Sequence, residues 1–299
     1  MDTLFKKVVV RILILISYLP FWLLYIISDL LYLILRYIVK YRNNVIKENL
    51  AYAFPEKSHS ELRMIRNKYY RYMCDLAVES FKLYSMTENQ LKKRLIIKGT
   101  EVADELYKKG KSVIVFAFHY NNWEWCSFLQ TKVNHLVLMV HNPMRDNQEM
   151  GKFLEHSRGQ WGGEHVPVHQ TARATMKYIQ EGKLTALWLA ADQTAPARSK
   201  FWISFLNREA AFFTGPEKIA VKTNQPIFFQ HVKRVKRGYY EVDYSILIEE
   251  PAKMKPEEIL IKYVDKMEEI IKKEPEFYLW SHRRWKHTRP ESTPLIEKN

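Results

Sequence analysis

The chain has 299 residues, and its 47 lysines and arginines against 33 aspartates and glutamates give a formal net charge of +14. This length allows one large domain or two small ones, and the charge favours an anionic partner: nucleic acid, an anionic membrane surface or an acidic protein. Its two cysteines, Cys74 and Cys126, stand in apolar surroundings without CxxC spacing, which argues against a metal centre or a disulfide framework and fits a reducing compartment.

The first strongly apolar segment, residues 12–28, contains no charge and has Pro20 in its middle, where a helix should kink. A second apolar run, residues 30–39, follows, and basic residues flank the pair on both sides, so charge does not orient a span. Charged residues separate the Ala-x-Ala at 51–53 from these runs, which argues against a cleaved signal peptide. We expect a membrane anchor, either a span or a kinked helix or hairpin in one leaflet, with a buried core helix as the alternative.

Helical and extended patterns alternate after this segment. Pro55 ends one helix, and two capping boxes, Ser58 with Glu61 and Thr87 with Gln90, open the next two. Apolar runs of strand length cover residues 94–99, 112–118, 135–140, 184–190 and 225–235. Residues 239–248 alternate and should pair antiparallel with the preceding run, and residues 256–275 form an amphipathic helix. The alternation predicts an α/β fold with a mixed, mostly parallel central sheet flanked by helices.

Polar residues follow three of the predicted strands. His119 follows residues 112–118, Asn142 and Arg145 follow the next strand along the chain, and Asp192 and Gln193 follow the third. In open sheets, chemistry collects at the carboxyl ends of strands, so we expect these groups to share one edge. Asp192 could equally cap the next turn.

The stretch HYNNWEW sets His119 five residues before Glu124. If a helix begins near Asn121, the turn can fold Glu124 back to one imidazole nitrogen, fixing the tautomer and stabilising the imidazolium. The other nitrogen could then take a proton from a hydroxyl, which is what direct acyl transfer from a thioester to an alcohol requires. A capped helix start with a hydrogen-bonded histidine is the purely structural alternative.

Two segments could hold an anion. The stretch FFTGPEK reads as a helix start with Thr214 as N-cap, Pro216 in the first turn and Glu217 completing a capping box. A phosphate or oxyanion near Thr214 and Gly215 would suit such a terminus, although ordinary capping explains the same residues. The preceding loop adds Arg198 as a head-group contact.

The stretch HRRWKHTRP near the C-terminus gathers basic and imidazole side chains around Trp285, among them Arg283 and Arg284. Such a patch suits nucleic acid or a phosphate-bearing lipid. With no recognisable nucleic-acid module and an apolar N-terminal segment, we favour lipid phosphates at a membrane surface. A solvated tail is the alternative.

Four segments carry a resemblance over nearly the whole chain: RNNVIKENLAYAFPE, HYNNWEW, AADQTAPARSKFWISFLNREAAFFTGP and PEFYLWSHRRWKHTRP. They resemble the late acyltransferases of lipid A biosynthesis, the lauroyl and myristoyl transferases of Gram-negative bacteria, within the H-x4-D/E acyltransferase superfamily. Glu124, where glycerolipid transferases usually carry aspartate, agrees with the lipid A side.

The resemblance implies a glycerolipid acyltransferase-like fold, with the anchor over residues 1–41 and the acyltransferase domain over residues 42–299. His119 and Glu124 would be the catalytic pair, with an arginine best matched by Arg158 and otherwise by Arg145. The expected substrate-binding residues are Asn122, Arg145, Asp192, Gln193, Arg198, Thr214, Gly215, Arg283 and Arg284.

The implied reaction moves a fatty acyl chain from acyl carrier protein to a hydroxyl of a lipid A precursor, at the cytoplasmic side of the inner membrane. The acidic carrier, the anionic precursor and anionic membrane lipids would be the partners, and no nucleic acid, metal or cofactor is expected. Two alternatives stay open from the sequence: transfer to another lipid acceptor, such as a glycerophospholipid, glycolipid or aminolipid, or a catalytically silent protein that binds the membrane surface.

Overall fold

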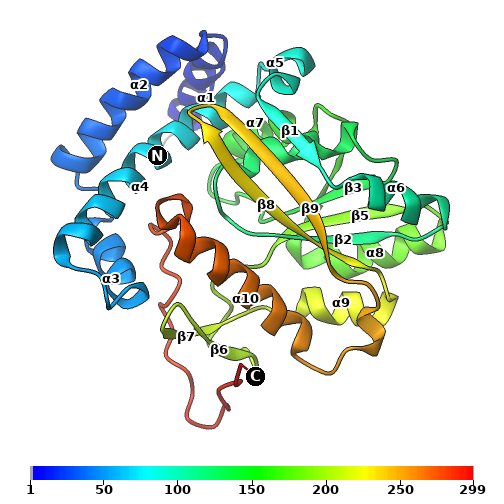
Figure 1. Ribbon diagram of the computed structural model, residues 1–299. Coiled ribbons are helices and arrows are strands. Elements are labelled where there is room, and N and C mark those ends of the chain that lie inside the picture. The colour runs from blue at the N-terminus through cyan, green and yellow to red at the C-terminus, as the bar shows by residue number, and fades with distance from the viewer. Residues whose placement is uncertain (1–2, 299) are drawn as a thin grey trace.

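The computed structural model describes residues 3–298 as an α/β fold around a seven-stranded sheet (Figure 1). The strand order is β1-β9-β8-β2-β5-β3-β4, and β8 pairs antiparallel with β9 while the other pairings are parallel. The strands are β1 (Leu95–Lys98), β2 (Val113–Ala117), β3 (Leu136–His141), β4 (Glu164–Pro167), β5 (Thr185–Ala190), β8 (Ile227–Lys236) and β9 (Tyr239–Ile248). The predicted fold class is confirmed.

Several helices begin where the sequence predicts a cap. The longer helices are α1 (Thr3–Ser17), α2 (Phe21–Leu33), α3 (Asn43–Ala53), α4 (His59–Leu83), α6 (Glu101–Lys108), α7 (Gln148–Gly159), α8 (Thr171–Gln180), α9 (Gly215–Thr223) and α10 (Glu258–Lys273). The shorter elements used below are the π-helical turn η1 (Ile34–Ile38), α5 (Glu88–Lys92) and the 3-10 helix η2 (Trp123–Thr131). The capping boxes predicted at the starts of α4 and α5 are present.

β2 lies in the middle of the sheet, and all of its residues are buried. Successive side chains of a strand point to opposite faces. Ile114 and Phe116 therefore join the core that contains Tyr263 of α10, whereas Val115 joins a second core with Trp125 of η2. This double burial explains why the strand is continuously apolar, and it fixes the direction in which the chain leaves the sheet at His119.

One β element was not foreseen. Strands β6 (Trp202–Phe205) and β7 (Arg208–Ala211) form a separate two-stranded antiparallel hairpin. Its turn holds Leu206 and Asn207 at positive φ, a conformation that the sequence does not announce, because a leucine rarely adopts it.

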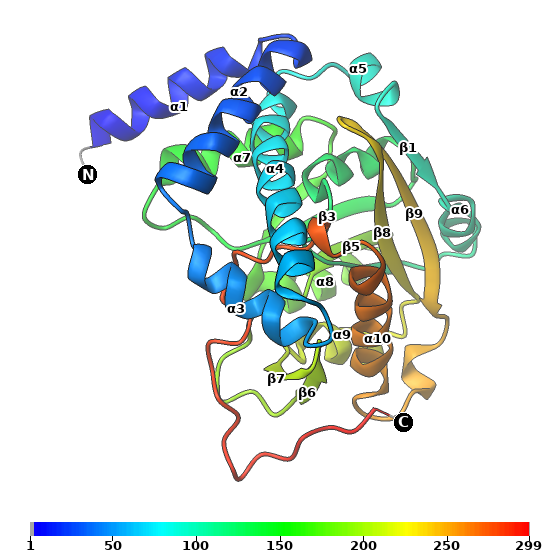
Figure 2. The same ribbon diagram turned by 60° about the vertical axis from the view of Figure 1, so that its left-hand side comes forward.

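The N-terminal arm consists of α1 and α2, which are separated at Pro20 as expected for a proline in an apolar helix. Both helices pack on α4, and Figure 2 shows α2 along its outer side. The outward faces carry exposed large apolar side chains, including Leu15, Tyr18, Trp22, Leu30 and Ile38. The segment Phe21–Ile38 is long and apolar enough to cross a membrane by length and composition. Division of the chain into an anchor and a catalytic domain stays a prediction.

Gly99 and Gly110 have similar backbone conformations but different surroundings, so alanine at each tests how tightly β1 packs against β9. Gly99 follows β1 at φ +78°, and a Cβ there would lie 2.1 Å from the carbonyl oxygen of Tyr244 in β9. Gly110 has a similar φ of +70° with nothing within 4 Å of its Cβ position. We expect Gly110→Ala to lower the free energy of unfolding by about 1 kcal/mol through backbone strain alone. Gly99→Ala should cost about 2 kcal/mol more, because backbone must move. Equal losses in chemical denaturation would contradict this packing.

Candidate active site

His119 and Asp192 meet at the carboxyl edge of the sheet. The register of β2 with β5 pairs Ala117 with Ala190, so the residues two positions beyond each strand end lie side by side. Nδ1 of His119 is 2.7 Å from Oδ1 of Asp192, and the backbone N–H of His119 donates to Oδ2 over 3.2 Å. The carboxylate therefore holds both the imidazole and the chain that carries it. Its side chain is almost fully buried, whereas that of His119 is 18% exposed.

The second imidazole nitrogen faces the amide of Gln193. With the Nδ1 proton donated to Asp192, Nε2 of His119 is the unprotonated nitrogen and accepts from Nε2 of Gln193 over 3.2 Å. A substrate hydroxyl that replaced the exposed Gln193 amide at this nitrogen would meet a base of the correct tautomer. Asp192 and Gln193 thus both hydrogen-bond His119, and the prediction that their strand end shares an edge with His119 is confirmed. The substrate contacts predicted for these two residues stay predictions.

Glu124 has a different partner from the one we expected. Its Oε2 accepts from Nε of Arg158 and its Oε1 from Nη2, both over 2.7 Å, which makes a bidentate ion pair. The expected hydrogen bond, in which the imidazole N–H donates to Glu124, is wrong, because Asp192 accepts from that nitrogen. η2 begins at Trp123 and turns Glu124 towards α7, where Arg158 lies. The two carboxylates therefore have separate tasks.

Each of these charged groups shifts the pKa of its partner so that the partner's charged form is favoured. Burial disfavours the imidazolium, but Asp192 and, beyond it, Glu124 outweigh burial and raise the pKa of His119. Burial also opposes the anion of each carboxylate, yet His119 lowers the pKa of Asp192 and Arg158 lowers the pKa of Glu124. Both carboxylates are therefore charged at neutral pH, and His119 is a stronger base than a free imidazole.

A cavity of about 1010 Å³ opens in front of these residues. His119, Glu124, Arg158 and Gln193 line one part of it. Much of the remaining wall is apolar: Met139, Val140, Leu154, Val168, Met176, Trp188, Leu189, Phe213 and Ile219. A cavity of this size with an apolar wall and a polar end suits a molecule that joins a hydrocarbon chain to a reactive head.

Lysines and imidazoles occur around the same cavity, and most of them were not predicted from the sequence. They are Lys218, Lys222, Lys286, His141, His165, His169 and His282. The two lysines of α9 are four residues apart and so lie on one helix face. That spacing was a signal that the sequence offered.

The predicted anion site at the start of α9 is present only in part. Gly215 lines the cavity, and Thr214 occupies the N-cap position. Its side chain makes no capping hydrogen bond, however, so the predicted capping box is wrong. Glu217 is instead buried, and burial raises its pKa to about 7. Its carboxylate lies at the start of α10 instead, where backbone N–H groups of Glu257, Ile259 and Leu260 offset part of the effect of burial.

Four other predicted substrate contacts lie away from the cavity lining. Arg145, Arg198 and Arg283 are exposed on loops, and their roles stay predictions. Asn122 is fully buried; its Oδ1 accepts from the Trp125 amide and its Nδ2 donates to Glu79. Asn122 therefore caps η2, and direct contact with substrate is excluded by its burial.

Arg284 also differs from the prediction of a surface phosphate contact. Its side chain is 1% exposed, with the guanidinium 4.0 Å from the ring centroid of Phe212. The positive charge of Arg284 contributes to the low pKa of Asp192. The hydroxyl of Thr194 donates to the backbone carbonyls of Arg283 and Arg284, which ties this segment to the loop after β5. Two other residues of this basic segment, His282 and Lys286, line the cavity.

A buried aspartate that orients a histidine, beside an arginine–carboxylate pair and an apolar cavity, defines a site suited to acyl transfer onto a hydroxyl. The family model described as bacterial lipid A biosynthesis acyltransferase matches residues 3–287, and the chain belongs to this family. It is similar, at 22% identity over 261 residues, to the lipid A biosynthesis palmitoleoyltransferase of Escherichia coli K12 and to a lipid A biosynthesis acyltransferase of Shigella flexneri. Each match covers 84% of this chain and 81% of the relative. The predicted family and enzyme class are confirmed.

Proposed function

We propose that this acyltransferase moves a fatty acyl chain from acyl carrier protein to a hydroxyl of a lipid A precursor. The observation that carries the proposal is that His119, hydrogen-bonded to Asp192, lines a largely apolar cavity of about 1010 Å³. The cavity supplies room for the acyl chain, and the pair supplies the base. Family membership supports lipid A as the acceptor class.

Nε2 of His119 takes the proton of the acceptor hydroxyl, and the oxygen attacks the thioester carbonyl carbon. Negative charge then develops on the carbonyl oxygen. Glu124 engages Nε and Nη2 of Arg158, so we assign Nη1 of that arginine to the oxyanion, where its fixed geometry suits a developing charge. The carbon–sulfur bond breaks, and the carrier thiolate receives the proton from His119. No covalent acyl-enzyme forms on this route.

The charge distribution supports an acidic carrier and an anionic lipid as partners. Lys218, Lys222 and Lys286 are exposed at the cavity lining, and the whole chain carries +14. Attraction of an acidic protein to such a rim raises the rate of encounter and weakens with salt. The exposed apolar side of the arm suits attachment to the cytoplasmic side of the inner membrane, held in part by anionic lipids.

Mass spectrometry of lipid A tests this function in the host. Deletion of the gene should remove one acyl chain, and expression of the intact protein should restore it. Expression of His119→Ala at equal level should not restore it, because the base is gone. An unchanged acyl pattern after deletion would contradict lipid A as the acceptor, and a loss from another lipid would identify the alternative.

A further inference from the structure

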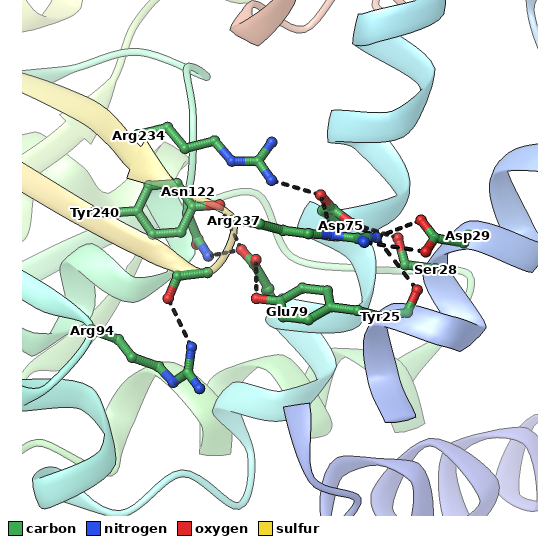
Figure 3. Close-up of polar contacts among 11 residues, drawn as sticks. Tyr25, Ser28, Asp29, Asp75, Glu79, Arg94, Asn122, Arg234, Arg237 and Tyr240 are labelled. Carbon is green, nitrogen blue, oxygen red and sulfur yellow. Dashed lines mark hydrogen bonds and ion pairs between the residues drawn. The ribbon is translucent and has the colours of Figure 1, made fainter. Parts of the chain in front are cut away.

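A carboxylate with no solvent access lies between the arm and the active site. Glu79 of α4 is 0% exposed. Its Oε1 accepts from the hydroxyl of Tyr25 on α2 over 2.9 Å, and its Oε2 accepts from Tyr240 of β9 and from Nδ2 of Asn122, each over 2.7 Å (Figure 3). One side chain thus joins the arm, the sheet and the turn that follows His119.

Through Asn122, Glu79 is connected to η2, the 3-10 helix that contains Glu124. Oδ1 of Asn122 accepts from the backbone N–H of Trp125 and so caps η2. The indole N–H of Trp125 donates to the backbone carbonyl of Glu79 over 3.1 Å. α4 therefore holds the start of η2 at two points. Glu124, which pairs with Arg158, lies between these two points in sequence, so its position depends on them.

A second set of polar contacts, close to Glu79, holds α2 of the arm against α4 and the β8–β9 region. Asp75, one turn before Glu79, accepts from the hydroxyl of Ser28 over 2.7 Å and from both Arg234 and Arg237. Arg237 also pairs with Asp29 of α2 (Figure 3). These contacts set the arm in one register along α4.

A glycine makes room for the contact on the arm. Gly238 lies in the β8–β9 turn at φ +72°, and a Cβ there would come within 1.9 Å of the Tyr25 hydroxyl. The turn and the arm therefore fit closely where Tyr25 reaches Glu79. Polar groups so deep in the protein are costly unless all are paired, and here the geometry pairs them.

We propose that Glu79 is a positioning residue for acyl transfer: seating of the arm through Tyr25 holds Glu79, which in turn orders Asn122 and the η2 turn that carries Glu124. This inference rests on the proposed function for its kinetic readout. The inference also predicts that Glu79 protects residues 119–131 from amide hydrogen exchange, which can be measured without substrate. The consequence is that displacement of the arm lowers catalysis without changing any residue that lines the cavity.

Glu79 meets only protein groups, because its side chain is fully buried. Burial, with a smaller contribution from Asp75, raises the pKa of Glu79 to about 7. Glutamine resembles the protonated side chain and keeps an oxygen that can accept from Asn122. Methionine of similar length removes every acceptor and leaves the Asn122 amide buried without a partner.

The test combines steady-state kinetics with amide hydrogen exchange on the full-length protein. Glu79→Met should lower kcat about tenfold or more with KM nearly unchanged, because misplacement and not binding is affected. Tyr25→Phe should lower kcat less. Both should raise exchange across residues 119–131. Glu79→Gln should stay near the parent in both measurements. Tyr107→Phe on α6 removes a hydroxyl far from this network and serves as the matched control.

Exchanging the amide of Asn122 and the carboxylate of Glu79 gives the most decisive measurement. Asn122→Asp keeps the cap of η2. At a pH above the raised pKa of Glu79, where both groups are ionised, it sets two carboxylates against each other, so kcat measured there should fall. In the double variant Glu79→Gln with Asn122→Asp, the glutamine amide can donate to the aspartate and restore the contact. The double variant should therefore be faster than Asn122→Asp alone, a coupling that a merely structural loss at either site would not produce.

Two results would overturn the proposal: Glu79→Met with kcat and exchange like the parent, or a double variant no faster than Asn122→Asp. If Glu79→Met does not fold, Glu79→Gln and the double variant decide the question. Failure of the proposed function is distinguishable, because the parent protein would then transfer no acyl chain. Exchange across residues 119–131 would in that case still show whether Glu79 orders the turn.

Discussion

Replacement of Asp192 by asparagine should lower kcat for acyl transfer by about 10³ to 10⁴ while the protein remains folded. Asparagine can present its amide N–H to Nδ1 of His119, which favours the tautomer with the proton on the wrong nitrogen. It also removes the negative charge that favours the imidazolium, the form that the proposed proton transfer to His119 would produce. KM should change little, because Asp192 is almost fully buried and is not among the residues that line the cavity.

The pH dependence gives this prediction a sign. Asp192 raises the pKa of His119 in the intact protein, so the rate should rise with pH through a value above that of a free imidazole. Loss of the aspartate charge lowers the pKa of His119, and the residual activity of Asp192→Asn should reach its plateau at lower pH. Glu124→Gln should move this limb less, because Glu124 is the weaker contributor to the pKa of His119.

Replacement of Arg158 by methionine should lower kcat by about 10² to 10³, because it removes the charged donor that we propose for the oxyanion. It should also destabilise the fold by about 3 kcal/mol or more, since Glu124 is left charged in a buried position. Both effects follow from the bidentate pair at 2.7 Å. Activity and unfolding free energy are therefore measured on the same preparation.

The double variant Glu124→Met with Arg158→Met separates the two effects. Removing both charges should restore most of the lost stability, because no unpaired ion remains. Transfer should stay as low as in Arg158→Met alone. Recovery of activity together with stability would show that the pair serves only the fold, and the oxyanion assignment would then be wrong.

The sequence predicted the fold well because its signals were local. Capping boxes, apolar runs of strand length and the alternation of residues 239–248 each depend on near neighbours, and each matches an element of the structure. The β6–β7 hairpin was missed because its turn uses Leu206 at positive φ, which no propensity favours.

The partners in the site depend on contacts between distant segments. Glu124 was expected to orient His119 because it is near in sequence, yet Asp192, 73 residues away, takes that position through the β2–β5 register. A residue that follows a strand end can meet its counterpart on the neighbouring strand more directly than one a helical turn ahead. Strand adjacency, and not the H-x4-E spacing, was the more informative signal for the base.

The basic C-terminal stretch shows that charge composition does not predict which arginines are exposed. Arg283 and Arg284 are adjacent in sequence, but the first is exposed and the second is buried against Phe205 and Phe212. Charge composition alone cannot distinguish them, because burial of an arginine depends on aromatic partners contributed by the unforeseen hairpin.

The most direct test of the proposed roles of His119 and Asp192 is acyl transfer from acyl carrier protein to a lipid A precursor by the purified parent protein, Asp192→Asn and Glu124→Gln across a range of pH. We expect transfer by the parent, a loss of about 10³ or more in Asp192→Asn, and a shift of its acid limb to lower pH. Equal rates and an unshifted limb in Asp192→Asn, with the shift in Glu124→Gln instead, would contradict Asp192 as the residue that orients His119.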